Sequence, residues 1–199
     1  MCELVQAGEN TYYFAASTNI GLYRISKNDV CLIDSGDSIE AGQAVADELS
    51  RRGLHLNFII NTHAHADHVG GNELLRQRTG CEVYLPHMEL GFVTFPPLQA
   101  ALLSGGNPLP ETVEKFMAKT ACTGALESAA LPKGLSLTHV DGHTVSMVAV
   151  GTDDGVWFLG DAVMGEALLK KFKITYNFDI EMHLRTLDAV EKLEGKLFI

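Results

Sequence analysis

The feature that most constrains this chain is a short apolar segment followed at once by a cluster of side chains that bind metals. Residues 54–60 (LHLNFII) form a mainly apolar run between turn-forming residues, which is the pattern of a buried strand. The next eight residues, 61–68 (NTHAHADH), contain three histidines and one aspartate. A buried strand that ends in such a cluster predicts a sheet with a chemical site at its edge.

Strand-like and helix-like segments alternate on both sides of this strand. Alternating apolar residues and turn formers predict strands, besides 54–60, at 3–7, 11–15, 21–25, 30–34, 81–85, 135–140, 144–150, 156–159 and 196–199. Apolar residues at helical spacing predict helices at 38–52, 72–78, 111–119 and 180–193. We expect Asp37 to cap the first helix, with Glu40 completing a capping box, and Gly53 to end it. The alternation predicts a layered α/β domain with helices outside the sheets.

The composition limits the domain count, the compartment and the partners. A chain of 199 residues suits a single domain over residues 1–199 that buries a sizeable core. Four scattered cysteines without a CxxC pair are typical of free thiols in the cytoplasm, and the first residues lack the features of a signal peptide. No apolar run reaches the roughly 20 residues of a membrane span. The formal net charge of −10 disfavours nucleic-acid binding, because an acidic surface repels phosphate backbones.

The spacing within the polar cluster suits metal binding. In an extended segment the side chains at i and i+2 point the same way, so His63 and His65 can bind one ion together. Asp67 and His68, where the chain turns, can reach a neighbouring position. The glycines at 70–71 let the backbone approach closely. Imidazole and carboxylate ligands suit zinc, iron or manganese, and so dense a cluster after an apolar strand argues against an ordinary polar surface loop.

The cluster and three further segments resemble a known family. The string His63-x-His65-x-Asp67-His68 is similar to the HxHxDH signature of the metallo-β-lactamase superfamily. Segments that resemble the family's other motifs follow in the family's order, at 34–36 (DSG), 141–144 (DGHT) and 160–161 (GD). The resemblance implies the αββα sandwich of that family, in which two mixed sheets lie face to face with helices outside.

The resemblance also implies a ligand set for two metal ions. It assigns His63, His65 and His143 to the first ion, Asp67 and His68 to the second, and Asp161 to a bridge between them. Without the resemblance, His143 is as well explained as a hydrogen-bonded histidine at a strand edge, and Asp161 as a helix N-cap. Asp34 has two explanations of equal weight, orientation of the site or capping of a turn.

The activity that the resemblance implies is metal-dependent hydrolysis of a small-molecule ester, thioester or lactone. Two zinc ions, or iron or manganese in their place, are expected to hold a hydroxide that attacks the substrate. Asp67 is expected to be catalytic, because it would orient this hydroxide and accept a proton as well as bind metal. The bridging Asp161 favours the glyoxalase II-like, lactonase-like and phosphodiesterase-like branches over the zinc β-lactamases proper.

Three other functions remain open at this stage. Persulfide dioxygenases share the fold and bind a single iron through residues equivalent to His63, His143 and Asp161, so an oxidoreductase is one alternative. A phosphodiesterase or nuclease of the same fold is another, opposed by the acidic charge. The third is a protein that has kept the fold and lost the chemistry. Neither nucleic acid nor a membrane is expected as a partner, and the sequence leaves the oligomeric state open.

Two regions depart from the regular pattern. The insertion at 87–131 separates the two halves of the predicted site and is either a lid over an apolar pocket or a structural element for packing or a subunit interface. The family supplies one more histidine to the second metal, just after the strand that follows the last helix, whereas this chain ends at Ile199 within that strand. His183 is expected to stay in the helix at 180–193, whose apolar side (Ile180, Leu184, Leu187, Val190) should pack on the domain. We therefore expect a C-terminal truncation.

Overall fold

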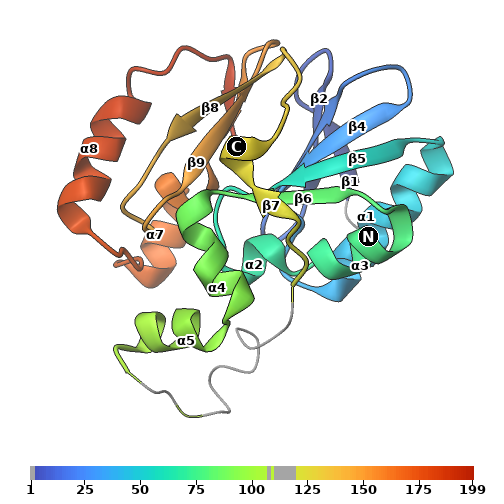
Figure 1. The fold of residues 1–199 in the computed structure, drawn as a ribbon. Coiled ribbons are helices and arrows are strands. Elements are labelled where there is room, and N and C mark those ends of the chain that lie inside the picture. The colour runs from blue at the N-terminus through green and yellow to red at the C-terminus, as the bar shows by residue number, and fades with distance from the viewer. Residues whose placement is uncertain (1–2, 107–108, 110–119) are drawn as a thin grey trace.

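The structure, a computed structural model, describes residues 3–106, 109 and 120–199, so the helix predicted at 111–119 lies outside the described residues. Within the described part, the strands form two sheets that lie face to face (Figure 1). The first has seven strands in sequence order: β1 (Glu3–Gln6), β2 (Thr11–Ala15), β3 (Ile20–Arg24), β4 (Asp29–Ile33), β5 (His55–Ile60), β6 (Glu82–Leu85) and β7 (Gly124–Ala125). The second has the order β11-β10-β9-β8: β11 (Leu197–Phe198), β10 (Val156–Phe158), β9 (Val148–Thr152) and β8 (Leu135–His139).

Both sheets are mixed. In the first sheet β1 to β4 pair antiparallel and β4 to β7 pair parallel. In the second, β8, β9 and β10 pair antiparallel, while β11 runs parallel to β10. Because β4 and β5 are parallel, with Ile33 opposite Ile60, the residues that follow both strands emerge at the same edge of the sheet.

Helices cover the outer faces of both sheets (Figure 1). α1 (Ile39–Arg52) and α3 (Asn72–Thr79) lie on the first sheet, and α8 (Ile180–Val190) lies on the second. Shorter helices connect these layers: α2 (Ala66–Val69), α4 (Leu90–Thr94), α5 (Pro97–Ser104), α7 (Glu166–Phe172) and the 3₁₀ turns η1 (His87–Glu89), η3 (Leu126–Ser128) and η4 (Gly160–Ala162). None of the described helices is long and apolar enough to cross a membrane.

The alternation of side chains along each strand builds the layers. In β4, Val30 and Leu32 pack toward α1 and α3, whereas Cys31 and Ile33 pack between the sheets against β9 and β10. A third apolar cluster, which includes Met147 and Leu159, packs against Val190 of α8. Three cores between four layers give the predicted αββα sandwich.

Most predicted elements are present within about two residues of the expected bounds, with three kinds of error. The strand predicted at 144–150 is instead β9 at Val148–Thr152, because 144–147 bends through the loop that follows His143. The short helices α2, α4, α5 and α7 and the strand β7 were not predicted. The capping prediction for Asp37 is wrong: Ser38 is extended and its hydroxyl accepts the N–H of Ala41 at 3.2 Å. Asp37 instead accepts a hydrogen bond from Ser17.

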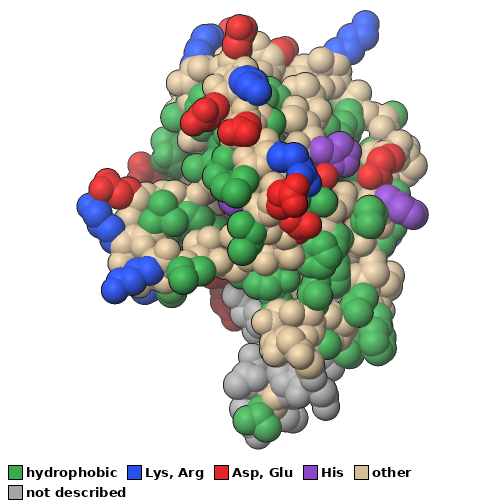
Figure 2. Space-filling view, turned by 90° about the vertical axis from the view of Figure 1, so that its left-hand side faces the viewer, with side chains coloured by type: hydrophobic (Ala, Val, Ile, Leu, Met, Phe, Trp, Pro, Cys, Tyr) green, Lys and Arg blue, Asp and Glu red, His purple; other side chains and the backbone are tan. Residues whose placement is uncertain are grey.

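The expectation for α8 is wrong in its details. Ile180 and Leu184 are 70% and 57% exposed, so the predicted apolar side does not lie on the domain as a whole. The inward face carries Thr186, which is buried and donates to the carbonyl of Asp141 at 2.7 Å, together with Val190. The helix is therefore anchored by a polar contact as much as by an apolar one. On the face of the molecule on this side, acidic and basic side chains intermingle with apolar ones (Figure 2).

A pair of glycines lets α1 lie close to the loop that carries the histidines. A Cβ atom on Gly42 of α1 would lie 2.9 Å from the Cα of Gly71 and 3.0 Å from its carbonyl oxygen. These are backbone atoms and cannot move aside as a flexible side chain would. The close contact bears out the expectation that glycine at 70–71 permits a close backbone approach.

We predict that Gly42→Ala destabilises the fold. The methyl group overpacks the contact at a cost of about 1–3 kcal/mol, which exceeds the roughly 1 kcal/mol that alanine gains over glycine in a helix. Gly91→Ala in α4 is the matched control, because its new Cβ meets only Leu98 at 3.7 Å. Urea unfolding should show a lower free energy of unfolding for the first variant and an unchanged or higher one for the second. Equal stability of the two variants would contradict the close-contact argument.

Candidate metal centre

The candidate site lies at the edge where the ends of strands from both sheets meet. From the first sheet, β5 leads into residues 61–68, and the N–H of Asp34 after β4 donates to the carbonyl of Ile60 at 2.8 Å. From the second sheet, the loop between β8 and β9 brings His143, and the turn after β10 brings Asp161. Segments far apart in the sequence therefore contribute to one site.

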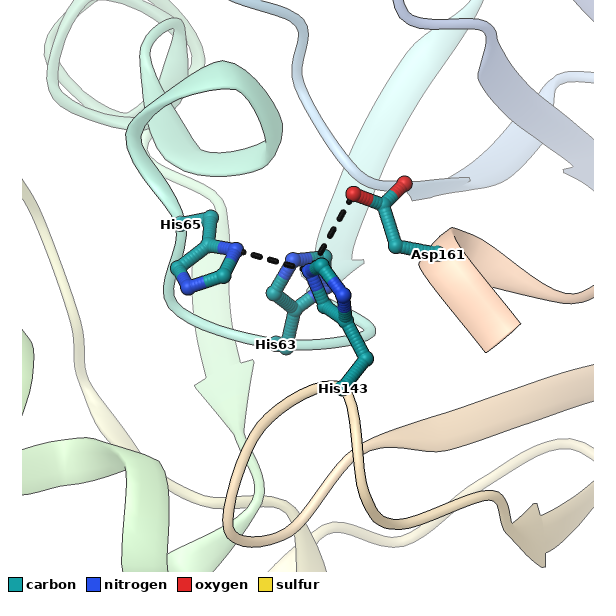
Figure 3. Close-up of side chains that lie close together, drawn as sticks. All are labelled: His63, His65, His143 and Asp161. Atoms are coloured by element: carbon teal, nitrogen blue, oxygen red, sulfur yellow. Dashed lines mark hydrogen bonds and ion pairs between the residues drawn. The ribbon is translucent and has the colours of Figure 1, made fainter. Parts of the chain in front are cut away.

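The structure brings all six predicted ligands together in two overlapping groups. His63, His65, His143 and Asp161 form the first group, and Asp67, His68 and Asp161 form the second. Within each group the candidate ligand atoms lie within 4.8 Å of one another. Figure 3 shows the first group, with three imidazole rings and the carboxylate of Asp161 turned toward a common centre. Asp161 belongs to both groups, as a bridging ligand would.

Hydrogen bonds leave a nitrogen of His63 free to bind a cation. The hydroxyl of Thr62 donates to Asp34 at 2.9 Å and must therefore accept from Nδ1 of His63, at 3.0 Å. With its proton on Nδ1, this imidazole presents a lone pair on Nε2. Nε2 is fully buried and has no hydrogen-bond partner. Because buried polar atoms are rarely left unsatisfied, the donor set fits a metal ion.

His143 and His65 face each other across the same centre. Nδ1 of His143 donates to the carbonyl of Tyr176 at 2.9 Å, which turns Nε2 toward the site. This Nε2 lies 3.0 Å from Nδ1 of His65 and 3.2 Å from an oxygen of Asp161 (Figure 3). Two imidazole nitrogens and a carboxylate oxygen so close together are the arrangement that a divalent cation stabilises.

Asp34 orients the second group. One carboxylate oxygen accepts from the backbone N–H of Thr62 at 2.7 Å, and the other accepts from Nδ1 of His68 at 2.8 Å. Nε2 of His68 then faces Asp161 at 3.2 Å, a close ionic contact without the alignment of a hydrogen bond. Asp34 adopts a left-handed backbone conformation (φ 62°), so it both turns the chain and orients a candidate ligand.

Burial and neighbouring charges shift the pKa values of the site residues in different directions. Burial lowers the pKa of His63 well below its usual value, and the positive charge of His68 lowers it further. Burial also lowers the pKa of His68, but the carboxylates of Asp34 and Asp161 outweigh this and raise it well above its usual value. Burial raises the pKa of Asp161, whereas the close contacts with the imidazole nitrogens of His143 and His68 bring it far below its usual range. The site thus combines a neutral imidazole with an ionised carboxylate at neutral pH.

Several polar residues that support the site were not predicted. Thr62 and the Tyr176 carbonyl orient His63 and His143, as described above. Glu89, in η1, is fully buried, and its carboxylate accepts the N–H groups of Ala64 and Ser146, both at 3.1 Å. Burial raises the pKa of Glu89. Nothing in the local sequence around Glu89 distinguishes it from an exposed glutamate, because its partners lie 25 and 57 positions away.

A cleft of about 750 Å³ opens over the second group of candidate ligands. Four of the candidate ligands line it: Asp67, His68, His143 and Asp161. Much of the rest of its lining is apolar and comes from α7 and the residues beside it: Val163, Met164, Leu168, Phe172, Ile174 and Tyr176. The site is therefore open to a small molecule with an apolar part.

Comparison with known proteins identifies the family. Residues 14–199 match the sequence profile of the metallo-beta-lactamase superfamily. The chain belongs to this superfamily. The resemblance noted in the sequence is thereby confirmed, and the superfamily's requirement for metal accounts for the cluster of histidine and aspartate side chains.

Members of the superfamily with assigned names are similar over much of the chain. It is 31% identical over 144 residues to a hydroxyacylglutathione hydrolase of Methylobacillus flagellatus, which covers 72% of this chain and 47% of that protein. It is 30% identical over 148 residues to a probable metallo-hydrolase of Bacillus subtilis, which covers 67% of this chain and 55% of that protein. The chain spans about half the length of the curated relatives it matches.

Solved structures share the fold. A subclass B3 metallo-beta-lactamase from a soil metagenome library, MEM-A1, superposes with a TM-score of 0.72 at 20% identity, over 99% of this chain and 78% of that one. The FEZ-1 metallo-beta-lactamase of Legionella gormanii gives a TM-score of 0.72 at 16% identity, over 100% and 80% of the two chains. These likenesses confirm the predicted fold class.

We predict that Asp34→Asn weakens metal binding. The amide oxygen must accept from the N–H of Thr62, which places the NH₂ group against His68. His68 must then accept at Nδ1 and carry its proton on Nε2, the atom that faces Asp161. Asparagine tolerates the left-handed backbone at this position. Metal affinity, measured by competition with a chelator, should fall about 10- to 100-fold.

Asp154→Asn is the control for this substitution. Asp154 also accepts several hydrogen bonds, from the N–H of Asn10 and the hydroxyls of Thr11 and Thr152, but it lies in the turn between β9 and β10. Both variants should lose roughly 1–3 kcal/mol of stability through unsatisfied buried groups. Only Asp34→Asn should lose metal affinity, and equal affinities would refute an orienting role for Asp34.

Proposed function

We propose that the protein is a metal-dependent hydrolase that cleaves an acyl ester or lactone and, foremost, an acyl thioester. The observation that carries the proposal is the convergence of six ligand side chains, including a buried His63 nitrogen without a hydrogen-bond partner. Family membership supports hydrolytic chemistry. The similarity to hydroxyacylglutathione hydrolases supports a thioester as the substrate class.

We assign the ligands to two zinc ions. His63, His65 and His143 would hold the first ion, Asp67 and His68 the second, and the Asp161 carboxylate both. Bound zinc would lower the pKa of a coordinated water toward neutrality and polarise the scissile carbonyl group. Asp67, at the rim of the cleft, would orient the attacking water and accept its proton. The apolar wall formed by Leu168 and Phe172 would bind the acyl chain.

The second ligand group separates this proposal from its rivals. A site with a single iron needs only the first group, whereas Asp67 and His68 lie with Asp161 in a second one. The intermingled charges on the face seen in Figure 2 give no support to a phosphodiesterase or nuclease. Cys31, Cys81 and Cys122 are free thiols, which suits the cytoplasm as the compartment.

The test of the proposed activity is metal analysis combined with turnover. Zinc-loaded protein should contain two zinc ions per chain and release thiol from acyl thioesters, as followed with a thiol-reactive dye. One iron per chain, with consumption of oxygen and no release of thiol, would favour the oxidoreductase instead.

We predict that the double substitution His63→Ala with His65→Ala abolishes tight zinc binding and thioester hydrolysis. Both rings contribute to the first group, so the ion loses two of its three imidazole ligands. The control is His55→Ala with His139→Ala, two exposed histidines away from the site. Zinc retained by the first double variant at the wild-type level would refute the ligand assignment.

We predict that Asp161→Asn lowers zinc occupancy mainly in the second group. The amide keeps the shape of the carboxylate but removes the charge that holds two cations near each other. The substitution should reduce turnover by a larger factor than it reduces the equilibrium constant for folding. Asp188→Asn, on the exposed side of α8, should change neither quantity. If Asp161→Asn keeps two zinc ions and full turnover, this aspartate is only a structural residue of η4.

A further inference from the structure

Residues 87–99 of the insertion hold the two peptide groups that flank Ala64, the residue between the first two histidines. The N–H of Ala64 donates to Oε2 of Glu89 at 3.1 Å, and the carbonyl of Ala64 accepts from Nε2 of Gln99 at 2.7 Å. Glu89 is 0% exposed and Gln99 is 5% exposed. Both polar groups of one residue in the metal-binding loop are therefore satisfied by buried side chains of the insertion.

The same carboxylate also reaches the other half of the site. Oε1 of Glu89 accepts the N–H of Ser146 at 3.1 Å. Ser146 lies three residues after His143 and just before β9, whereas Ala64 follows β5 of the other sheet. One buried side chain thus connects the two loops, from different sheets, that supply the three histidines of the first group.

Glutamate is the side chain that this position requires. Both of its oxygens face backbone N–H donors, so both must be acceptors, as in an ionised carboxylate. An amide of the same shape would place its NH₂ group against one of the two donors. A buried carboxylate is costly unless it is well hydrogen-bonded, so its presence needs an explanation beyond packing.

We propose that Glu89 and Gln99 are positioning residues, and that residues 87–99 hold His63, His65 and His143 in the geometry that binds the first metal ion. The two side chains fix the peptide groups on either side of Ala64, and with them the backbone that orients His63 and His65. This assignment rests on the proposed metal site. It supports the packing explanation for this part of the insertion, because both side chains are buried against the metal-binding loop.

The test is zinc affinity and steady-state kinetics of Glu89→Gln in the full chain. Zinc affinity, measured with a competing chelator, should fall about 10- to 100-fold. At saturating zinc, kcat for an acyl thioester should fall while KM stays within about twofold, because Glu89 does not line the cleft over the second group. Affinity and kcat within twofold of the wild type in a folded variant would overturn the proposal.

Glu127→Gln is the matched control. Glu127 lies in the same insertion and also accepts a backbone N–H, that of His87, but it is exposed and does not contact the metal-binding loops. It should leave zinc affinity and kcat unchanged. An equal loss in both variants would mean that the insertion acts only through general stability, and would overturn the proposal.

A second variant keeps the proposal testable if Glu89→Gln does not fold. Gln99→Met keeps the length of the side chain and removes the donor to Ala64, so zinc affinity should fall several-fold. Where both single variants fold, the double variant should lose less than the product of the two effects, because both act on the backbone of one residue, Ala64. An unchanged zinc affinity in Gln99→Met would overturn the role of Gln99. Wild-type protein that binds no zinc would instead overturn the proposed function.

Discussion

The carboxylate of Asp34 is the interaction on which the site depends. It accepts from the N–H and hydroxyl of Thr62 and from Nδ1 of His68, and so connects the ends of two parallel strands. Through the Thr62 hydroxyl it also determines which nitrogen of His63 carries the proton. One buried charge therefore sets the chain direction after β4 and the tautomers of two candidate ligands. Such a group is stable only because each oxygen is hydrogen-bonded.

The packing of the two sheets brings together histidine and aspartate side chains that lie far apart in the sequence. Each sheet supplies part of the ligand set, so packing of Cys31 and Ile33 against the second sheet is a condition for the site. Nε2 of His143 and Nδ1 of His65, 3.0 Å apart beside a carboxylate, can share only one proton, whereas a divalent cation between them would bind all three groups. Metal binding and packing of the sheets should therefore stabilise each other, since a preformed site holds the ion and the ion links both sheets.

Residues 87–99, an irregular part of the insertion, supply hydrogen bonds to loops that connect the regular strands. Its sequence mixes apolar residues with turn formers, as a lid would. The apolar residues Phe95 and Leu98 are 63% and 46% exposed. Yet Glu89 and Gln99 are buried against the histidine loop, where they bind backbone groups of Ala64 and Ser146. Backbone polar groups in such loops need partners, and side chains from a neighbouring loop supply them.

While the αββα sandwich came from the resemblance to the family, the sequence by itself determined the order of the main strands and helices, a layered α/β architecture, and the histidine and aspartate cluster after β5. These follow from local periodicity and from spacing within a few residues, which chain geometry constrains directly. It did not determine the cap at Ser38, the inward face of α8, or the roles of Glu89, Gln99 and the Tyr176 carbonyl. Those depend on hydrogen bonds between residues tens of positions apart, so only the packing of the sheets and loops decides which polar atoms are buried and what they contact.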